Sequence, residues 1–162
     1  MTIKVGDTLP DATFTQFGDK GITPVSLGDL AKGKKLVLFG LPGAFTGTCS
    51  ARHLPSFMNT AEAFRAKGVD HIVCVSVNDP FVMNAWDKAS GASGAGVQLV
   101  ADGDGSFARA IGMAFSNPQI GFLDRCKRFA AYAEDGVIKV WNPEPDSGAC
   151  EISAGETLLE QI

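Results

Sequence analysis

The chain has little positive charge and no long hydrophobic run. Its 14 Lys and Arg residues are outnumbered by 18 Asp and Glu residues, and the net charge of −4 leaves no basic stripe for nucleic acid. The longest nearly unbroken apolar stretch, residues 36–45, contains two glycines and a proline, and it is well short of the roughly 20 residues that a membrane span requires. The first ten residues lack the hydrophobic core of a signal peptide. We therefore expect a cytoplasmic protein.

Paired metal-binding and redox motifs are also missing. None of the four cysteines is close enough to another for a Cys-x-x-Cys motif, and neither histidine has a partner at zinc-site spacing. The glycines and aspartates of residues 102–113 imitate parts of dinucleotide and calcium motifs, but the following βαβ unit and the calcium-binding Glu are absent. We therefore expect no bound cofactor or metal, and each cysteine has to be considered singly.

Strand-like and helix-like segments alternate along the chain. The runs "KLVLFG", "HIVCVSV" and "VQLVAD" are typical of strands covered on both faces, and residues 127–141 predict a hairpin around Glu-Asp-Gly. Helices are expected within residues 25–35 and 106–113, and after Asp79. A further helix is expected from Cys49 to Gly68, with a kink at Pro55, and the last one from Ser153 to Ile162. This order predicts one α/β domain over residues 1–162, with a mixed central sheet flanked by helices and a thioredoxin-like character.

The loop "LPGAFTGTCS" stands out because it follows a buried strand and leads to Cys49. Cys49 is expected at or just inside the first turn of a helix, where unpaired N–H groups and the helix dipole favour an anion. Such a position lowers the pKa of a thiol, so a reactive cysteine is favoured over a small buried one. Thr46 lies three residues earlier, and its hydroxyl can turn back toward the sulfur. Pro42 gives the loop a rigid wall.

Pro42, Thr46 and Cys49 form a Pro-x-x-x-Thr-x-x-Cys motif. This motif resembles that of the peroxiredoxins, which are thiol peroxidases with a thioredoxin-like fold. The blocks "LFGLPGAFTGTCSARHLPSF", "VCVSVNDPFVMNAW" and "KRFAAYAEDGVIKVWNPEP" further resemble, in the same order, the atypical type-II subgroup, which includes the mammalian fifth class and the plant type-II proteins. Gly47 departs from the subgroup, since most members carry proline there, and "FSNPQIGFLDRC" also diverges.

The resemblance implies a role for each matching residue. Cys49 would attack one peroxide oxygen as a thiolate and become a sulfenic acid, and Thr46 would hydrogen-bond the thiolate and the peroxide. Arg128, in "KRFAAYA", would stabilise the thiolate and polarise the peroxide, and Pro42 would shield the sulfur from water. Backbone N–H groups of residues 47–49 would bind the distal oxygen. His53, one turn after the cysteine, is expected to pack or hydrogen-bond rather than transfer protons.

The implied activity is the thiol-dependent reduction of hydrogen peroxide and small alkyl hydroperoxides. One alternative is a redox-signalling protein that passes its oxidation to a partner. A second is a thioredoxin-like disulfide oxidoreductase, although that would need a paired thiol close to Cys49. The resemblance also implies a homodimer.

Three cysteines are candidates for resolving the sulfenic acid. Cys150 matches the resolving position of the members that form an internal disulfide, in a shorter loop, and it is our preferred candidate. Cys74 matches the second cysteine of the plant-type members, but its alternation with Ile72 predicts a buried structural thiol. Cys126 shares alternation with Arg128 and has no precedent in the family. A one-cysteine cycle with glutathione or glutaredoxin is the close alternative, and thioredoxin is the other external reductant.

Overall fold

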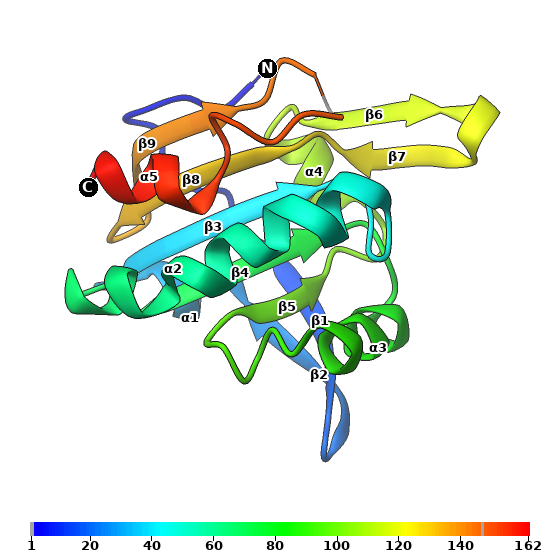
Figure 1. The fold of residues 1–162 in the computed structure, drawn as a ribbon, viewed down its shortest axis with the longest axis horizontal. Coiled ribbons are helices and arrows are strands. Elements are labelled where there is room, and N and C mark those ends of the chain that lie inside the picture. The colour runs from blue at the N-terminus through cyan, green and yellow to red at the C-terminus, as the bar shows by residue number, and fades with distance from the viewer. Residues whose placement is uncertain (1, 147) are drawn as a thin grey trace.

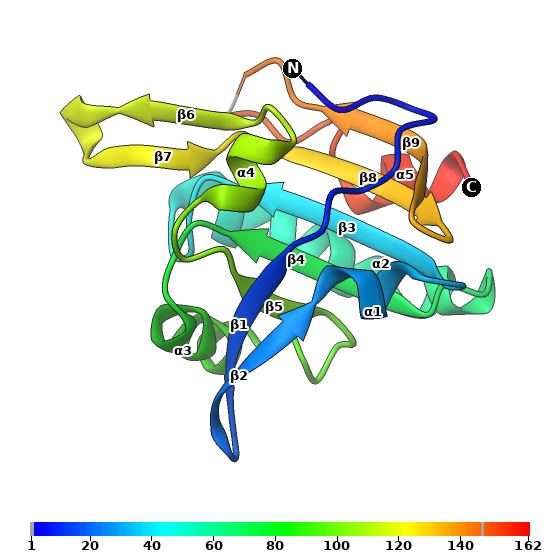
Figure 2. The ribbon, with the colours of Figure 1, turned by 180° about the vertical axis from the view of Figure 1, so that it is seen from behind.

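A single central sheet organises the molecule, with helices on both of its faces (Figures 1 and 2). The computed structural model describes residues 2–146 and 148–162, and for Cys49 it describes the backbone but not the side chain. Seven strands pair in the order β2-β1-β5-β4-β3-β8-β9. A separate two-stranded sheet, β6-β7, extends from one end of the body as an arm (Figure 1). The mixed sheet flanked by helices confirms the predicted fold class.

The centre of the sheet consists of the predicted apolar runs. β3 (Lys35–Leu41), β4 (His71–Ser76) and β5 (Gln98–Ala101) are parallel to one another. Antiparallel to β3 lies β8 (Phe129–Glu134), which forms the predicted hairpin with β9 (Val137–Pro143). The two turn residues of this hairpin, at positions 135 and 136, have φ values of 50° and 79°, as a tight type I′ connection requires.

Two pairs of strands were not predicted. β1 (Thr13–Gly18) and β2 (Gly21–Ser26) form an antiparallel hairpin at one edge of the sheet. The arm consists of β6 (Ala114–Asn117), the 3₁₀ turn η2 (Pro118–Ile120) and β7 (Phe122–Cys126). Most residues of β2 and of the arm are exposed or only partly buried, so these strands lack the continuous apolar run by which the central strands are recognised.

The helices cover the two faces of the sheet unequally. α2 (Leu54–Ala66), α3 (Pro80–Ser90) and α5 (Gly155–Glu160) lie on one face, and α1 (Leu27–Ala31) and α4 (Ser106–Ala110) lie on the other (Figures 1 and 2). The side chains of β3 alternate between the two hydrophobic clusters. Both faces of the strand are therefore buried, which explains its unbroken apolar sequence.

Two predicted helix caps are confirmed and one is wrong. Ser26 Oγ accepts a hydrogen bond from Asp29 N (3.3 Å), and Asp79 Oδ1 accepts one from Val82 N (2.9 Å). Ser153 does not cap the last helix, which begins at Gly155 without a side-chain cap. The N-cap position is taken by Ala154, one residue after Ser153, and the Ser153 hydroxyl donates to the buried Glu144 carboxylate in a charge-assisted hydrogen bond. α4 also ends at Ala110, three residues earlier than expected.

The helix that carries Cys49 starts irregularly. Residues 47 and 48 already have helical backbone, and the π-helical turn η1 (Cys49–His53) follows before α2 begins. Pro55 lies in the first turn of α2, and because proline has no N–H and its ring crowds the carbonyl four residues earlier, the preceding turn widens. Pro55 therefore does not kink the middle of a helix as predicted: it lies in the first turn of α2, and the irregular part is the π turn before it, of which Cys49 is the first residue.

Candidate active site

The loop that precedes Cys49 is held by side chains from the neighbouring strand. Ala44 N donates a hydrogen bond to Asn78 Oδ1 (3.0 Å), and the same oxygen accepts one from Ser76 Oγ (2.6 Å). Both polar residues come from the carboxyl end of β4 and the residues after it, so the parallel pairing of β3 and β4 places them beside the loop. The loop is therefore fixed before the helix begins.

Thr46 occupies the last turn before the helix. Its hydroxyl donates to Gly43 O at 2.7 Å, and its carbonyl accepts from Ser50 N at 2.9 Å. The residue before it, Phe45, has a φ of 64° and a side chain that is 55% exposed. A positive φ is costly for a bulky residue and is tolerated where the surrounding structure imposes it, often at functional sites.

Arg128 is a buried cation at this end of the sheet. It lies just before β8, its side chain is 2% exposed, and its Nη1 donates to His53 Nδ1 at 3.0 Å. His53 is fully buried, and its Nε2 lies 3.0 Å from Ser153 O. Because a carbonyl oxygen only accepts, Nε2 carries the imidazole proton and Nδ1 is the acceptor. Burial, and then the positive charge of Arg128, hold the pKa of His53 well below 6.5, so the ring is neutral at pH 7.

Glu144 connects Arg128 with the segment that contains Cys150. Glu144 N donates to Arg128 O at 2.9 Å. Its Oε2 accepts from Ser153 N (3.0 Å), Ser153 Oγ (2.5 Å) and Glu151 N (3.1 Å). Although burial acts to raise the pKa of Glu144, these hydrogen bonds hold it below its ordinary value. A carboxylate therefore fixes the residues on the carboxyl side of Cys150.

A cavity of about 470 Å³ opens beside the start of the helix. One wall is formed by the loop before Cys49, by Arg128, and by residues close to the carboxyl end of β9; the other comes from the arm. The lining residues are Pro42, Thr46, Gly47, Thr48, Arg128, Asp146 and Gly148 on the first wall, and Phe115, Asn117, Ile120 and Phe122 on the second. The structure thus brings Pro42, Thr46 and Arg128 together around one cavity, next to the backbone of Cys49.

Arg125 is a second guanidinium at this site that the sequence analysis missed. Its Nη1 donates to Pro42 O at 3.2 Å, and its guanidinium carbon lies 4.9 Å from the centre of the Phe122 ring. It therefore ties the arm to the loop before Cys49. Its place within the divergent segment "FSNPQIGFLDRC", three residues before Arg128, was the only available cue.

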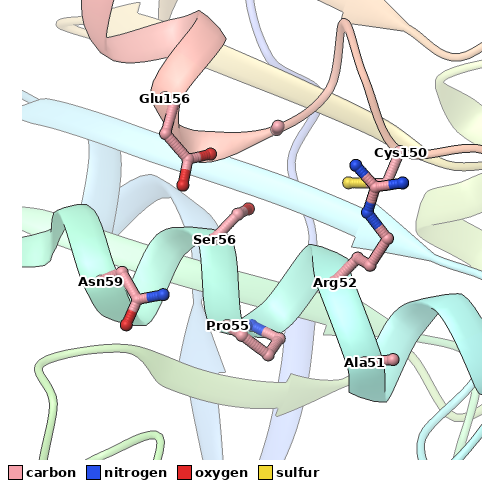
Figure 3. A pocket seen from close by; sticks show the side chains of 8 residues that line it. Ala51, Arg52, Pro55, Ser56, Asn59, Cys150 and Glu156 are labelled. Carbon is pink, nitrogen blue, oxygen red and sulfur yellow. The ribbon is translucent and has the colours of Figure 1, made fainter.

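Cys150 lies beside a second, smaller cavity of about 230 Å³ between α2 and the start of α5 (Figure 3). Arg52, Ser56 and Glu156 line this cavity together with Cys150. Cys150 is only 2% exposed, and burial raises the pKa of its thiol, partly opposed by hydrogen bonding to Ser153. The loop before it is tied to the cysteine turn, because Thr48 Oγ1 donates to Gly148 O at 2.8 Å.

The other two cysteines belong to the core. Cys74 is fully buried under α2, as its alternation with Ile72 predicted. Cys126 is 2% exposed in the cluster on the opposite face of the sheet, and its Sγ donates to Lys127 O at 3.2 Å. Neither residue lines the larger cavity. Cys74, Cys126 and Cys150 are all present as thiols rather than disulfides.

Within residues 2–146 and 148–162, no cluster of three or more His, Cys, Asp or Glu residues is arranged to hold a metal ion. The helices among the same residues include none with the length and apolar character needed to cross a bilayer.

Similarity to known proteins covers nearly the whole chain. Residues 4–159 match the Redoxin family. Peroxiredoxin-2C of Oryza sativa subsp. japonica is 46% identical over 161 residues, which are 99% of this chain and 98% of the relative. The crystal structure of reduced Prx3 in complex with H₂O₂ from Vibrio vulnificus superimposes with a TM-score of 0.92 and 42% identity, covering 99% of each chain. The crystal structure of oxidised Prx3 from Vibrio vulnificus superimposes with a TM-score of 0.89 and 42% identity, covering 99% of this chain and 100% of the other.

Proposed function

The chain belongs to the type-II peroxiredoxins within the Redoxin family and is a thiol-dependent peroxidase, and from this premise we propose that Cys49 is the thiol that attacks the peroxide. The Cys49 thiolate forms a bond with one peroxide oxygen while the O–O bond breaks. The second oxygen leaves with the electron pair and takes up a proton, giving water or an alcohol, and Cys49 becomes a sulfenic acid. The position of the Cys49 backbone at a helix start, next to the cavity lined by Thr46 and Arg128, carries this proposal.

The cavity supplies the groups that this reaction needs. Negative charge moves from sulfur to the leaving oxygen, so a permanently charged guanidinium beside that path stabilises the transition state more than the ground state. Arg128 is such a group, since it lines the cavity and is otherwise buried. The Thr46 hydroxyl already donates to Gly43 O. Thr46 is therefore best placed to accept a hydrogen bond from the peroxide rather than to donate one to the thiolate.

The proposed substrates are hydrogen peroxide and small alkyl hydroperoxides. The Vibrio vulnificus relative has been crystallised with H₂O₂, which supports the first. The cavity of about 470 Å³ is far larger than hydrogen peroxide requires, because a water molecule takes up only about 30 Å³ in the liquid. Its second wall is mostly apolar, with Phe115, Ile120 and Phe122. This wall is suited to the alkyl group of an organic hydroperoxide.

We propose that Cys150 resolves the sulfenic acid by forming a disulfide with Cys49 and releasing water. The Cys150 segment must shift for this step, because its thiol is buried and the flanking backbone is bound by Glu144. Attack on the Cys150 sulfur of that disulfide expels Cys49, the thiol with the lower expected pKa and hence the better leaving group. The cavity next to Cys150 and Arg52 supports access by a small anionic thiol such as glutathione; glutaredoxin and thioredoxin are protein alternatives.

Mass spectrometry after one equivalent of peroxide tests both steps. A Cys49–Cys150 disulfide is the expected product without glutathione. A Cys49–glutathione adduct with Cys150 still reduced, formed as fast in Cys150→Ser as in the wild type, would instead establish the one-cysteine cycle. Cys49→Ser should abolish peroxide consumption. Cys74→Ser is the matched control and should change it little, because Cys74 lies in the core away from the cavity.

We also propose that the protein forms a homodimer. Phe45, on the loop before Cys49, is 55% exposed, and Phe81, in the first turn of α3, is 57% exposed. Phe45 lies 6.5 Å from Trp86 of α3, measured between ring centres, so each of the two exposed rings is on or beside α3. Analytical ultracentrifugation should show that the wild type is a dimer. The dimer of Phe81→Glu should have a higher dissociation constant. A monomeric wild type at micromolar concentration would contradict the proposal.

A further inference from the structure

Four residues form a closed ring of hydrogen bonds around the buried cation. Arg128 Nη1 donates to His53 Nδ1, and His53 Nε2 donates to Ser153 O. Ser153 N and Oγ both donate to Glu144 Oε2, and Glu144 N donates to Arg128 O, which closes the ring. All four side chains are less than a tenth exposed. The four residues come from η1, the position before β8, the position after β9 and the segment after Cys150, which are distant in sequence.

We propose that His53 is a positioning residue for Arg128, and that Ser153 and Glu144 extend this support to the segment that carries Cys150. The inference rests on the proposed role of Arg128 in stabilising the Cys49 thiolate. A guanidinium has donors but no acceptor, so its orientation is fixed by acceptors around it. Neutral His53 supplies one such acceptor on the side of η1, while Arg128 also lines the larger cavity.

The ring gives His53 a single suitable protonation state. A protonated His53 imidazole would present an N–H to the guanidinium instead of an acceptor, and two cations would face each other in a buried site. The Ser153 carbonyl holds the proton on Nε2 and so leaves Nδ1 as the acceptor. The other titratable groups near His53 are Glu144, which binds Ser153, and Cys150. The positive charges of Arg128 and Arg52 act to lower the pKa of the Cys150 thiol against the effect of burial. Ser153, in the segment after Cys150, thereby sets the tautomer of His53, and the orientation of Arg128 depends on that tautomer.

Two substitutions of His53 separate positioning from packing. His53→Leu fills similar space but cannot accept from Arg128, so we expect a fall in kcat/KM for peroxide of about a hundredfold, the cost of a small misplacement at an active site. The apparent pKa of Cys49, measured from the pH dependence of its alkylation by iodoacetamide, should rise in the same variant. His53→Gln offers an amide oxygen to Arg128 and an amide N–H to Ser153 O. It should restore both quantities to within a few-fold of the wild type.

Phe57→Leu is the matched packing control. The Phe57 ring stacks on Phe39 at 4.0 Å and lies 5.6 Å from the His53 ring, measured between centres. This substitution should lower the melting temperature without moving the alkylation pKa of Cys49. If folded His53→Leu matched the wild type in kcat/KM and in the alkylation pKa, or if His53→Gln were as impaired as His53→Leu, the positioning role would be wrong.

Nitrogen NMR of the histidines provides a test that does not depend on folding of a His53 variant. The chain has only two histidines, and His71, half-buried at the start of β4, supplies the second signal. We expect His53 to remain a neutral Nε2–H tautomer between about pH 6 and 8. In Arg128→Met its Nδ1 shift should move. A mixture of tautomers, or an unchanged Nδ1 shift, would overturn the inference.

Failure of this inference is distinguishable from failure of the proposed function. If Arg128→Met leaves the alkylation pKa of Cys49 unchanged, Arg128 does not stabilise the thiolate and the proposed mechanism is wrong. If Arg128→Met raises that pKa but His53→Leu does not, the mechanism stands and only the positioning role of His53 is lost.

Discussion

The two walls of the larger cavity are held in place by different forces. The wall with Arg128 is held by polar contacts: buried Arg128 donates to His53 Nδ1 and accepts at its carbonyl from Glu144 N, and the adjoining loop donates to Asn78 Oδ1. The wall on the arm is made of partly exposed apolar side chains on two strands that pair with each other and not with the main sheet. We infer that the first wall provides the chemistry common to all peroxides, and that the second distinguishes one peroxide from another.

The largest effect is expected from removing the buried cation. Arg128→Met should lower kcat/KM for hydrogen peroxide by about a hundredfold or more, because a charged donor aimed at developing charge is lost from a water-poor site. Stopped-flow measurement of peroxide consumption would determine the change. Arg125→Met is the control at the arm: it breaks the hydrogen bond to Pro42 O and should cost much less. Equal losses in the two variants would contradict the division between the walls.

The second prediction concerns the pH dependence of the polar wall. The pKa of Glu144 is lowered from 4.5 in the folded protein, so its carboxylate stabilises the fold above the ordinary pKa, and this stabilisation disappears as the pH falls through the folded value. Glu144→Gln should therefore lower the free energy of unfolding at pH 7 by about 1.5–3 kcal/mol. Urea denaturation at pH 7 and at acid pH would show the deficit shrinking in acid. Glu160→Gln, an exposed substitution on α5, should show no such trend.

The third prediction concerns the apolar wall. Ile120→Asn should reduce kcat/KM for cumene hydroperoxide by about tenfold, the typical cost of losing an apolar contact with substrate, and should leave the value for hydrogen peroxide nearly unchanged. Leu123→Asn is the matched control, because Leu123 is exposed on the same arm and does not line the cavity. An equal loss for both peroxides in Ile120→Asn would assign the arm a general role instead of a selective one.

The smallest effect is expected at Gly47, on the wall that also contains Arg128. An added Cβ would meet no atom within 4 Å, and the φ of this residue is not in the left-handed region. Gly47→Ala should therefore stabilise the protein by about 0.5 kcal/mol, since it restricts the unfolded chain. Gly105→Ala should destabilise it, because Gly105 has a φ of 73° and a Cβ there would lie 3.1 Å from Asp124 O. Thermal unfolding should show a higher melting temperature for Gly47→Ala and a lower one for Gly105→Ala than for the wild type.

The sequence predicted the centre of the fold and the chemical part of the site. Continuous apolar runs identified the three parallel strands because both faces of each are buried. The short motif from Pro42 to Cys49 located the cavity loop, and the family resemblance selected Arg128. These features depend on residues close together in sequence, or on a resemblance that spans the chain.

The long-range polar contacts were beyond prediction. The ring from His53 to Ser153 joins residues 100 positions apart, and no local pattern marks Glu144 as its buried carboxylate. Ser153 is predicted as a helix cap because its spacing from Glu156 fits a capping box, whereas in the folded chain the helix begins one residue later and the Ser153 hydroxyl donates to the distant Glu144 carboxylate. The arm was missed for a different reason, since its strands bury little surface and show no periodic apolar pattern.

The separateness of the arm has a consequence for how such enzymes diversify. Since β6 and β7 do not pair with the seven-stranded sheet, most of their side chains can be exchanged without repacking the main core. Substrate preference can therefore change during evolution, or be redesigned by exchanging this segment between homologues. The residues that break the O–O bond lie outside the arm and would stay the same.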